Sequence, residues 1–81
     1  MNGFNTRVEY RGEVYIVQTQ DKGPAVPYIE SLIYKSGRLL TSKRTSYIPL
    51  LDSPGFRDRI REEMENQHKR ILESIVEGRF V

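Results

Sequence analysis

The chain has 81 residues, no cysteine and a formal net charge of +2. This length predicts a single domain over residues 1–81, with a modest core that assembly could stabilise further. The lack of cysteine excludes disulfides, iron–sulfur clusters and thiolate zinc sites. We find no apolar run long enough to span a bilayer, and the first residues lack the pattern of a signal peptide, so we expect a cytoplasmic protein with no membrane contact.

The first fifty residues carry the pattern of an antiparallel sheet. Two short turn signals, Arg11–Gly12 and Ser36–Gly37, each separate two runs of β-forming residues. A longer loop, Asp21–Pro27, contains two prolines and separates the second run from the third. The runs lie at residues 4–10, 14–19, 28–34 and 39–45. Together they predict a four-stranded meander within residues 1–50.

The Ser36–Gly37 turn also predicts a register for the last two strands. With these two residues alone in the turn, Tyr34 lies opposite Leu39. Counting back along both strands then places Glu30 opposite Lys43. We therefore expect an ion pair between these two side chains, which is weak where it is exposed.

Residues 53–78 predict one long amphipathic helix. Ser53 is a capping residue, Pro54 suits the first helical position, and Gly78 suits the C-terminal cap. Apolar residues form one broad stripe at Phe56, Ile60, Met64, Ile71, Leu72, Ile75 and Val76. The predicted fold class is therefore α+β, a four-stranded antiparallel β-meander followed by one long C-terminal α-helix packed on one sheet face.

Gln67 and His68 interrupt the apolar stripe of this helix. They form either a polar pair at the margin of the core or a polar contact that fixes the register of two chains. We expect the half before them to cover the sheet and the half after them to contact a partner. The predicted protein interface consists of Ile71, Leu72, Ile75, Val76 and Phe80.

The sequence gives little support to catalysis. His68 is the single histidine, and the carboxylates Glu62, Glu63 and Glu65 lie on the polar helix face. We therefore expect no enzyme, no metal and no cofactor. Between Glu30 and Asp52 every charged residue is basic, which makes binding of nucleic acid or a small anion the alternative function. The candidate contacts are Lys35, Arg38, Lys43, Arg44 and Tyr47.

Several short segments within residues 4–47 resemble a group of short bacterial proteins of unassigned function. The resemblance lies in Phe4–Val8, Tyr15–Asp21, Gly23, Pro27, Ile33–Tyr34, Gly37 and Ser42–Lys43. It implies a bacterial, cytoplasmic setting and transfers no functional residue. Because the sheet carries apolar residues on both faces, we expect a non-enzymatic interaction module that forms a homo-oligomer or binds a small protein partner.

Overall fold

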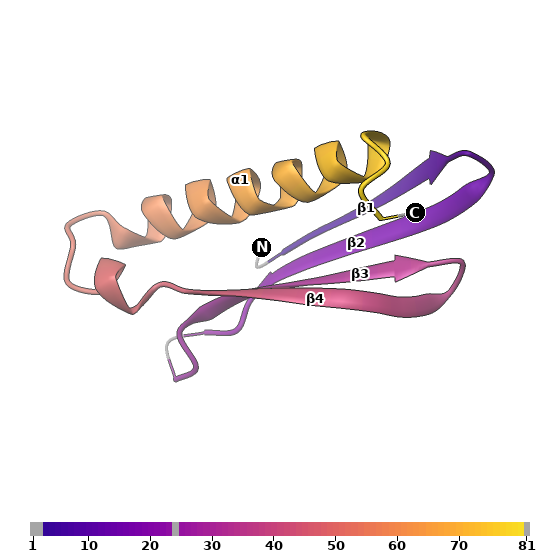
Figure 1. The fold of residues 1–81 in the computed structure, drawn as a ribbon. Helices are drawn as coiled ribbons and strands as arrows, with labels where there is room; N and C mark the ends of the chain where they lie inside the picture. The colour runs from indigo at the N-terminus through magenta and orange to yellow at the C-terminus, as the bar shows by residue number, and fades with distance from the viewer. Residues whose placement is uncertain (1–2, 24, 81) are drawn as a thin grey trace.

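The computed structural model describes residues 3–23 and 25–80, and it has the predicted α+β fold (Figure 1). Its four strands form one antiparallel sheet in the order β1-β2-β3-β4. A single long helix follows and lies on one face of this sheet. The elements are β1 (Gly3–Tyr10), β2 (Glu13–Asp21), β3 (Tyr28–Lys35), β4 (Arg38–Ser46), the 3-10 helix η1 (Ile48–Leu50) and α1 (Phe56–Val76).

Both short turns are built as the sequence predicts. The backbone φ angles are 52° at Arg11 and 80° at Gly12, and 51° at Ser36 and 84° at Gly37. Two successive positive φ values define the type I′ turn, whose twist matches that of the paired strands. The loop between β2 and β3 is confirmed as well, although Pro24 lies outside the described residues.

A β-bulge makes the predicted register of β3 and β4 wrong beyond the turn. Tyr34 does lie opposite Leu39, but Ile33 lies opposite Thr41, so Leu40 is an extra residue in β4. Every later pair therefore shifts by one residue. As a result, Glu30 pairs with Arg44 and not with Lys43.

Helix α1 begins two residues later than predicted. Gly55 has a left-handed backbone, with φ at 68°, which breaks helical geometry between Pro54 and Phe56. The amide of Ser53 bonds the carbonyl of Leu50 and so continues the turn of η1, and its side chain does not cap α1.

The end of α1 is the predicted one. The Gly78 amide donates to the Ile75 carbonyl, and the Arg79 amide donates to the Ser74 carbonyl. This pair of bonds is the Schellman motif, in which a glycine with positive φ ends the helix.

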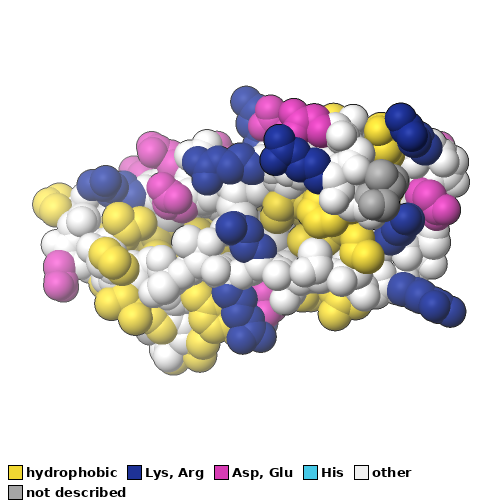
Figure 2. All heavy atoms as spheres, in the orientation of Figure 1, with side chains coloured by type: hydrophobic (Ala, Val, Ile, Leu, Met, Phe, Trp, Pro, Cys, Tyr) yellow, Lys and Arg dark blue, Asp and Glu magenta, His cyan; other side chains and the backbone are white. Residues whose placement is uncertain are grey.

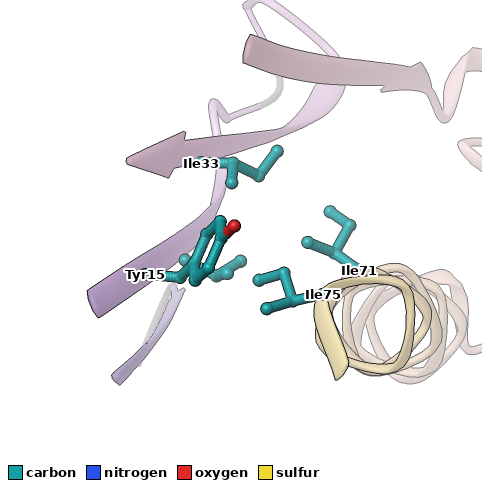
Figure 3. Close-up of a cluster of buried hydrophobic side chains, with 5 residues drawn as sticks. Tyr15, Ile33, Ile71 and Ile75 are labelled. Carbon is teal, nitrogen blue, oxygen red and sulfur yellow. The ribbon is translucent and has the colours of Figure 1, made fainter. Parts of the chain in front are cut away.

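The core under α1 consists of two hydrophobic clusters. The hairpin-end cluster lies toward the two short turns and comprises Tyr15, Val17, Ile33, Ile71 and Ile75 (Figure 3). The linker-end cluster lies toward η1 and comprises Ile29, Tyr47, Ile60 and Met64. Strand β4 lies largely outside both, since eight of its nine residues are exposed.

The prediction that the second half of α1 contacts a partner is wrong for most of its residues. Ile71 and Ile75 are buried in the hairpin-end cluster, and Leu72 and Phe80 pack against it. The Schellman turn folds the chain back after α1, and Phe80 thereby reaches the core. Of the predicted interface residues, Val76 alone is exposed.

Candidate functional site

The sheet has a free face, opposite α1, which we call the open face. Strand register assigns the residues to the two faces, because alternate side chains point in opposite directions. Tyr15 and Val17 point toward the helix and are fully buried beneath it. Their strand neighbours Val14 and Ile16 occupy the open face instead.

Apolar side chains gather on the open face toward the short turns. Ile16, Tyr34 and Leu39 form one cross-strand row, and Val14 and Leu32 lie in the adjacent rows. All five are at least partly exposed, Leu39 most of all at 57 %. We call these five residues the open-face patch. A contiguous apolar surface of this kind is typical of an interface.

Opposite charges are paired at the margins of the open face. On β1 the Arg7 guanidinium lies 3.1 Å from the Glu9 carboxylate. Near β4 the Arg44 guanidinium lies 3.0 Å from the Glu30 carboxylate, and the Lys22 ammonium lies 3.8 Å from it. These pairs leave little net charge around the patch, so the patch can meet an apolar surface without strong repulsion.

A polar layer separates the two hydrophobic clusters beneath α1. His68 lies 2.8 Å from the Thr6 hydroxyl through Nε2 and 2.7 Å from the Thr19 hydroxyl through Nδ1. Thr19 lies 2.7 Å from Ser31. Gln67 donates to Ser31 at 2.9 Å and accepts from Thr45 at 2.5 Å. One hydrogen-bonded chain thus links the helix to all four strands, and neither predicted role of Gln67 and His68 matches it. The polar layer comprises Thr6, Thr19, Ser31, Thr45, Gln67 and His68.

The donors and acceptors of the polar layer fit together in one direction only. Ser31 accepts from Gln67, so its own hydroxyl is free to donate to Thr19. Thr19 then donates to Nδ1 of His68, and the Nε2–H group donates to Thr6. If the imidazole were protonated, Nδ1–H would donate to Thr19, and the Thr19 hydroxyl would then donate to Ser31. The Ser31 hydroxyl would be left without an acceptor in the polar layer. Burial also lowers the pKa of His68 below its usual 6.5, which favours the neutral ring.

The predicted nucleic-acid contacts do not converge on one surface. Lys43 pairs with Ser31 and so lies on the helix side of β4, whereas Arg44 lies on the open face and is bound to Glu30. Tyr47 is buried and donates to Asp21 at 2.6 Å, so its ring is not available for base stacking. Lys35 lies over the ring of Tyr15, and Arg38 lies at the turn.

Figure 2 shows the same dispersion of basic groups. Lysine and arginine side chains are scattered along the helix and across the middle of the molecule, with hydrophobic side chains between them. No histidine is visible on this face, in agreement with the burial of His68. On the face seen in Figure 2, these groups do not form the continuous basic groove that tracks a nucleic-acid backbone.

Sequence reasoning missed the strand partners of the polar layer and the Asp21–Tyr47 pair. A signal for the layer was present, because Thr19 and Ser31 are small polar residues at inward positions of otherwise apolar strands. Asp21 begins the predicted loop, and it accepts the Gly23 amide at 2.8 Å, as aspartates in turns commonly do. Its second bond, to Tyr47, joins residues 26 positions apart and leaves no local pattern.

Over residues 3–23 and 25–80, no helix is long and apolar enough to cross a membrane. The same residues contain no group of three or more histidine, cysteine or acidic side chains arranged to hold a metal. Comparison with protein-family models, curated proteins and solved structures returned no match.

Proposed function

We propose that this protein is a non-enzymatic interaction module that self-associates through its open face, in the cytoplasmic, bacterial setting that the resemblance implies. The observation that carries the proposal is the open-face patch, which lies on the side of the sheet that α1 leaves uncovered. His68, the single histidine, supports a non-enzymatic role, since both its ring nitrogens bond threonine hydroxyls inside the fold.

The size of the sheet favours a second copy that covers the whole open face. Four strands about 4.8 Å apart and eight residues long at about 3.3 Å per residue give a projected area of roughly 500 Å². A stable interface buries about 800 Å² of accessible surface per partner. A pleated face of this projected size approaches that value, whereas pairing along one strand edge does not. We therefore propose that two open faces stack with their strands roughly aligned.

Charge also favours a second copy of this chain over a strongly charged partner. The Arg7–Glu9 and Arg44–Glu30 pairs neutralise most of the charge on the open face. Two such faces do not repel each other, and their apolar patches are chemically alike. A nucleic acid would instead need Arg44 to exchange its bond to Glu30 for a phosphate.

Sedimentation velocity on the full chain tests this proposal. At about 100 µM we expect a dimer that dissociates on dilution. Leu39→Lys, in the patch, should weaken the dimer at least tenfold. Ile48→Lys is the matched control because Ile48, on η1, is 60 % exposed against 57 % for Leu39. It should leave the dimer intact.

Two results would overturn the proposal. One is a monomer at all concentrations up to about 1 mM. The other is equal loss of the dimer in both variants. Binding to single-stranded RNA or DNA at low salt that disappears when Lys43 and Arg44 are both replaced by alanine would support the alternative function.

A further inference from the structure

A cavity lies between the first half of α1 and the sheet, on the face opposite the open face. Its volume is about 480 Å³, within the range of small-ligand sites. At about 30 Å³ per water molecule it holds roughly sixteen waters, or an alkyl chain of about eight to twelve carbons with its head group. It is lined by Gly3, Phe4, Asp21, Gly23, Tyr47, Leu51, Phe56, Arg57, Ile60, Arg61 and Met64.

Five apolar side chains form one part of the cavity wall. Phe4 comes from β1, Leu51 comes from the linker before α1, and Phe56, Ile60 and Met64 come from the helix. These five side chains form a surface on which a hydrocarbon chain gains free energy by leaving water, about 0.8 kcal/mol per buried methylene.

One acidic group lines the cavity, and its charge is already satisfied. The Asp21 carboxylate accepts from the Tyr47 hydroxyl at 2.6 Å and from the Gly23 amide at 2.8 Å. Both donors are internal to the fold, so this side of the cavity does not need a ligand to be complete.

Two basic residues of α1, Arg57 and Arg61, also line the cavity. Arg57 and Arg61 are one helical turn apart, so their side chains leave the helix on the same side. Both line the cavity and both are exposed. Within the described residues neither forms an ion pair, and the Arg57 guanidinium lies 5.8 Å from the ring centre of Phe56. Two guanidinium groups that line one cavity are suited to bind one anionic head group.

We propose that this cavity binds an amphipathic carboxylate, with its alkyl chain between Phe4, Ile60 and Met64 and its head group on Arg57 and Arg61. With Asp21 ionised, the two arginines give the cavity a net charge of +1. That charge matches a carboxylate rather than a doubly charged phosphate. The site lies on the helix side of the sheet and does not depend on self-association.

Isothermal titration calorimetry with decanoate, below its micellar concentration, tests the site on the full chain. We expect saturable 1:1 binding, weaker binding of decyl phosphate, and no binding of decanol or decyltrimethylammonium. The methyl resonance of Met64 should shift in step with the heat, and it is readily assigned because the chain has two methionines.

The paired variant R57Q/R61Q should bind decanoate at least tenfold more weakly, because charge-assisted hydrogen bonds are lost. Its control is R59Q/R70Q, which removes the same charge from exposed positions of α1 that do not line the cavity. The control should bind as the unaltered chain does. All four arginines are exposed, so neither variant disturbs the core.

Three results would overturn the proposal. The first is no saturable heat and no Met64 shift at decanoate concentrations up to about 1 mM. The second is equal binding of decanol, which would mean that the arginines do not select a charge. The third is an equal loss in R59Q/R70Q, which would mean that only the overall charge of the helix matters. Each can occur whether or not the protein forms a dimer, so failure here is distinguishable from failure of the proposed function.

Discussion

The hairpin-end and linker-end clusters lie beneath the same helix but are built differently. At the hairpin end, strand residues and helix residues enclose one another, and Tyr15, Val17, Ile33 and Ile75 are all 2 % exposed or less. At the linker end, the partly buried neighbours include residues of η1, the linker and the first helical turn. The cavity of about 480 Å³ lies at that end.

The difference shows how a small domain can contain both a tightly packed cluster and a cavity. Paired strands close the hairpin end, because side chains on adjacent strands approach at fixed spacing, and the bulge at Leu40 lies in the exposed strand β4. The linker end is closed by irregular backbone, which fills space less completely. Between them the polar layer fixes the helix to the sheet, so that a cavity at one end does not loosen packing at the other.

The largest expected effect is on the packing of the hairpin-end cluster. Ile75→Ala removes a side chain that is 1 % exposed, and it should lower the free energy of unfolding by about 2–5 kcal/mol. Met64→Ala removes a side chain of similar size that lines the cavity, and water can fill the space that it leaves. It should cost about 2 kcal/mol, at the low end of that range. Urea denaturation measures both, and equal losses would mean that the two clusters are packed alike.

A smaller effect is expected from the polar layer that divides the clusters. His68→Leu leaves Thr6 and Thr19 without their partner, and should cost about 1–3 kcal/mol. Adding Thr19→Val to His68→Leu removes one of the hydroxyls left without a partner. The double variant should therefore lose less free energy of unfolding than the sum of the two single losses. We expect a coupling of about 1 kcal/mol from the denaturation of all four proteins. Strict additivity would contradict a direct bond between the two side chains.

Local sequence patterns predict the helix and strands that enclose the two clusters, but they do not predict the detailed contacts between these elements. Period-two strands, two short turns and an amphipathic helix ended by Gly78 are local patterns, and each is confirmed. The division of the helix at Gln67–His68 is also visible in the sequence. The bulge at Leu40 is not visible, because an extra residue in an exposed strand disturbs no pattern.

The candidate sites depend on residues that are distant in the chain. The open-face patch could be predicted only in part, since the choice between alternate strand residues depends on which face the helix covers. The cavity joins Phe4 of β1 to Arg57 and Arg61 of α1, about fifty residues later. In the sequence those arginines lie at the edge of the apolar stripe of the helix, and no local pattern indicates that they lie beside a space.

The pH dependence of stability tests the neutral state of His68 in the polar layer. Burial holds the pKa of His68 below 6.5, so between these two pKa values the unfolded chain binds more protons than the folded one. Stability should therefore be greatest above about pH 6.5 and should fall as the pH drops through the folded pKa. Urea denaturation at about pH 7.5 and about pH 5.5 measures this loss. His68→Gln should show no such dependence between those values, and a stability that rises toward acid would contradict a buried neutral ring.

The smallest effect concerns the linker end and is confined to alkaline pH. Burial, with the nearby Asp21 carboxylate, raises the pKa of Tyr47 from 10.0 to about 12. Between those values the folded chain holds a proton that the unfolded chain releases, so stability should fall as the pH rises above about 10. The phenolate absorbance should include a step near this raised pKa, and Tyr47→Phe should remove that step. Asp21→Asn should lower the pKa of this step without bringing it to 10, because burial, the larger cause, remains. A step unmoved by Asp21→Asn would mean that the Asp21 carboxylate does not accept a hydrogen bond from the Tyr47 hydroxyl.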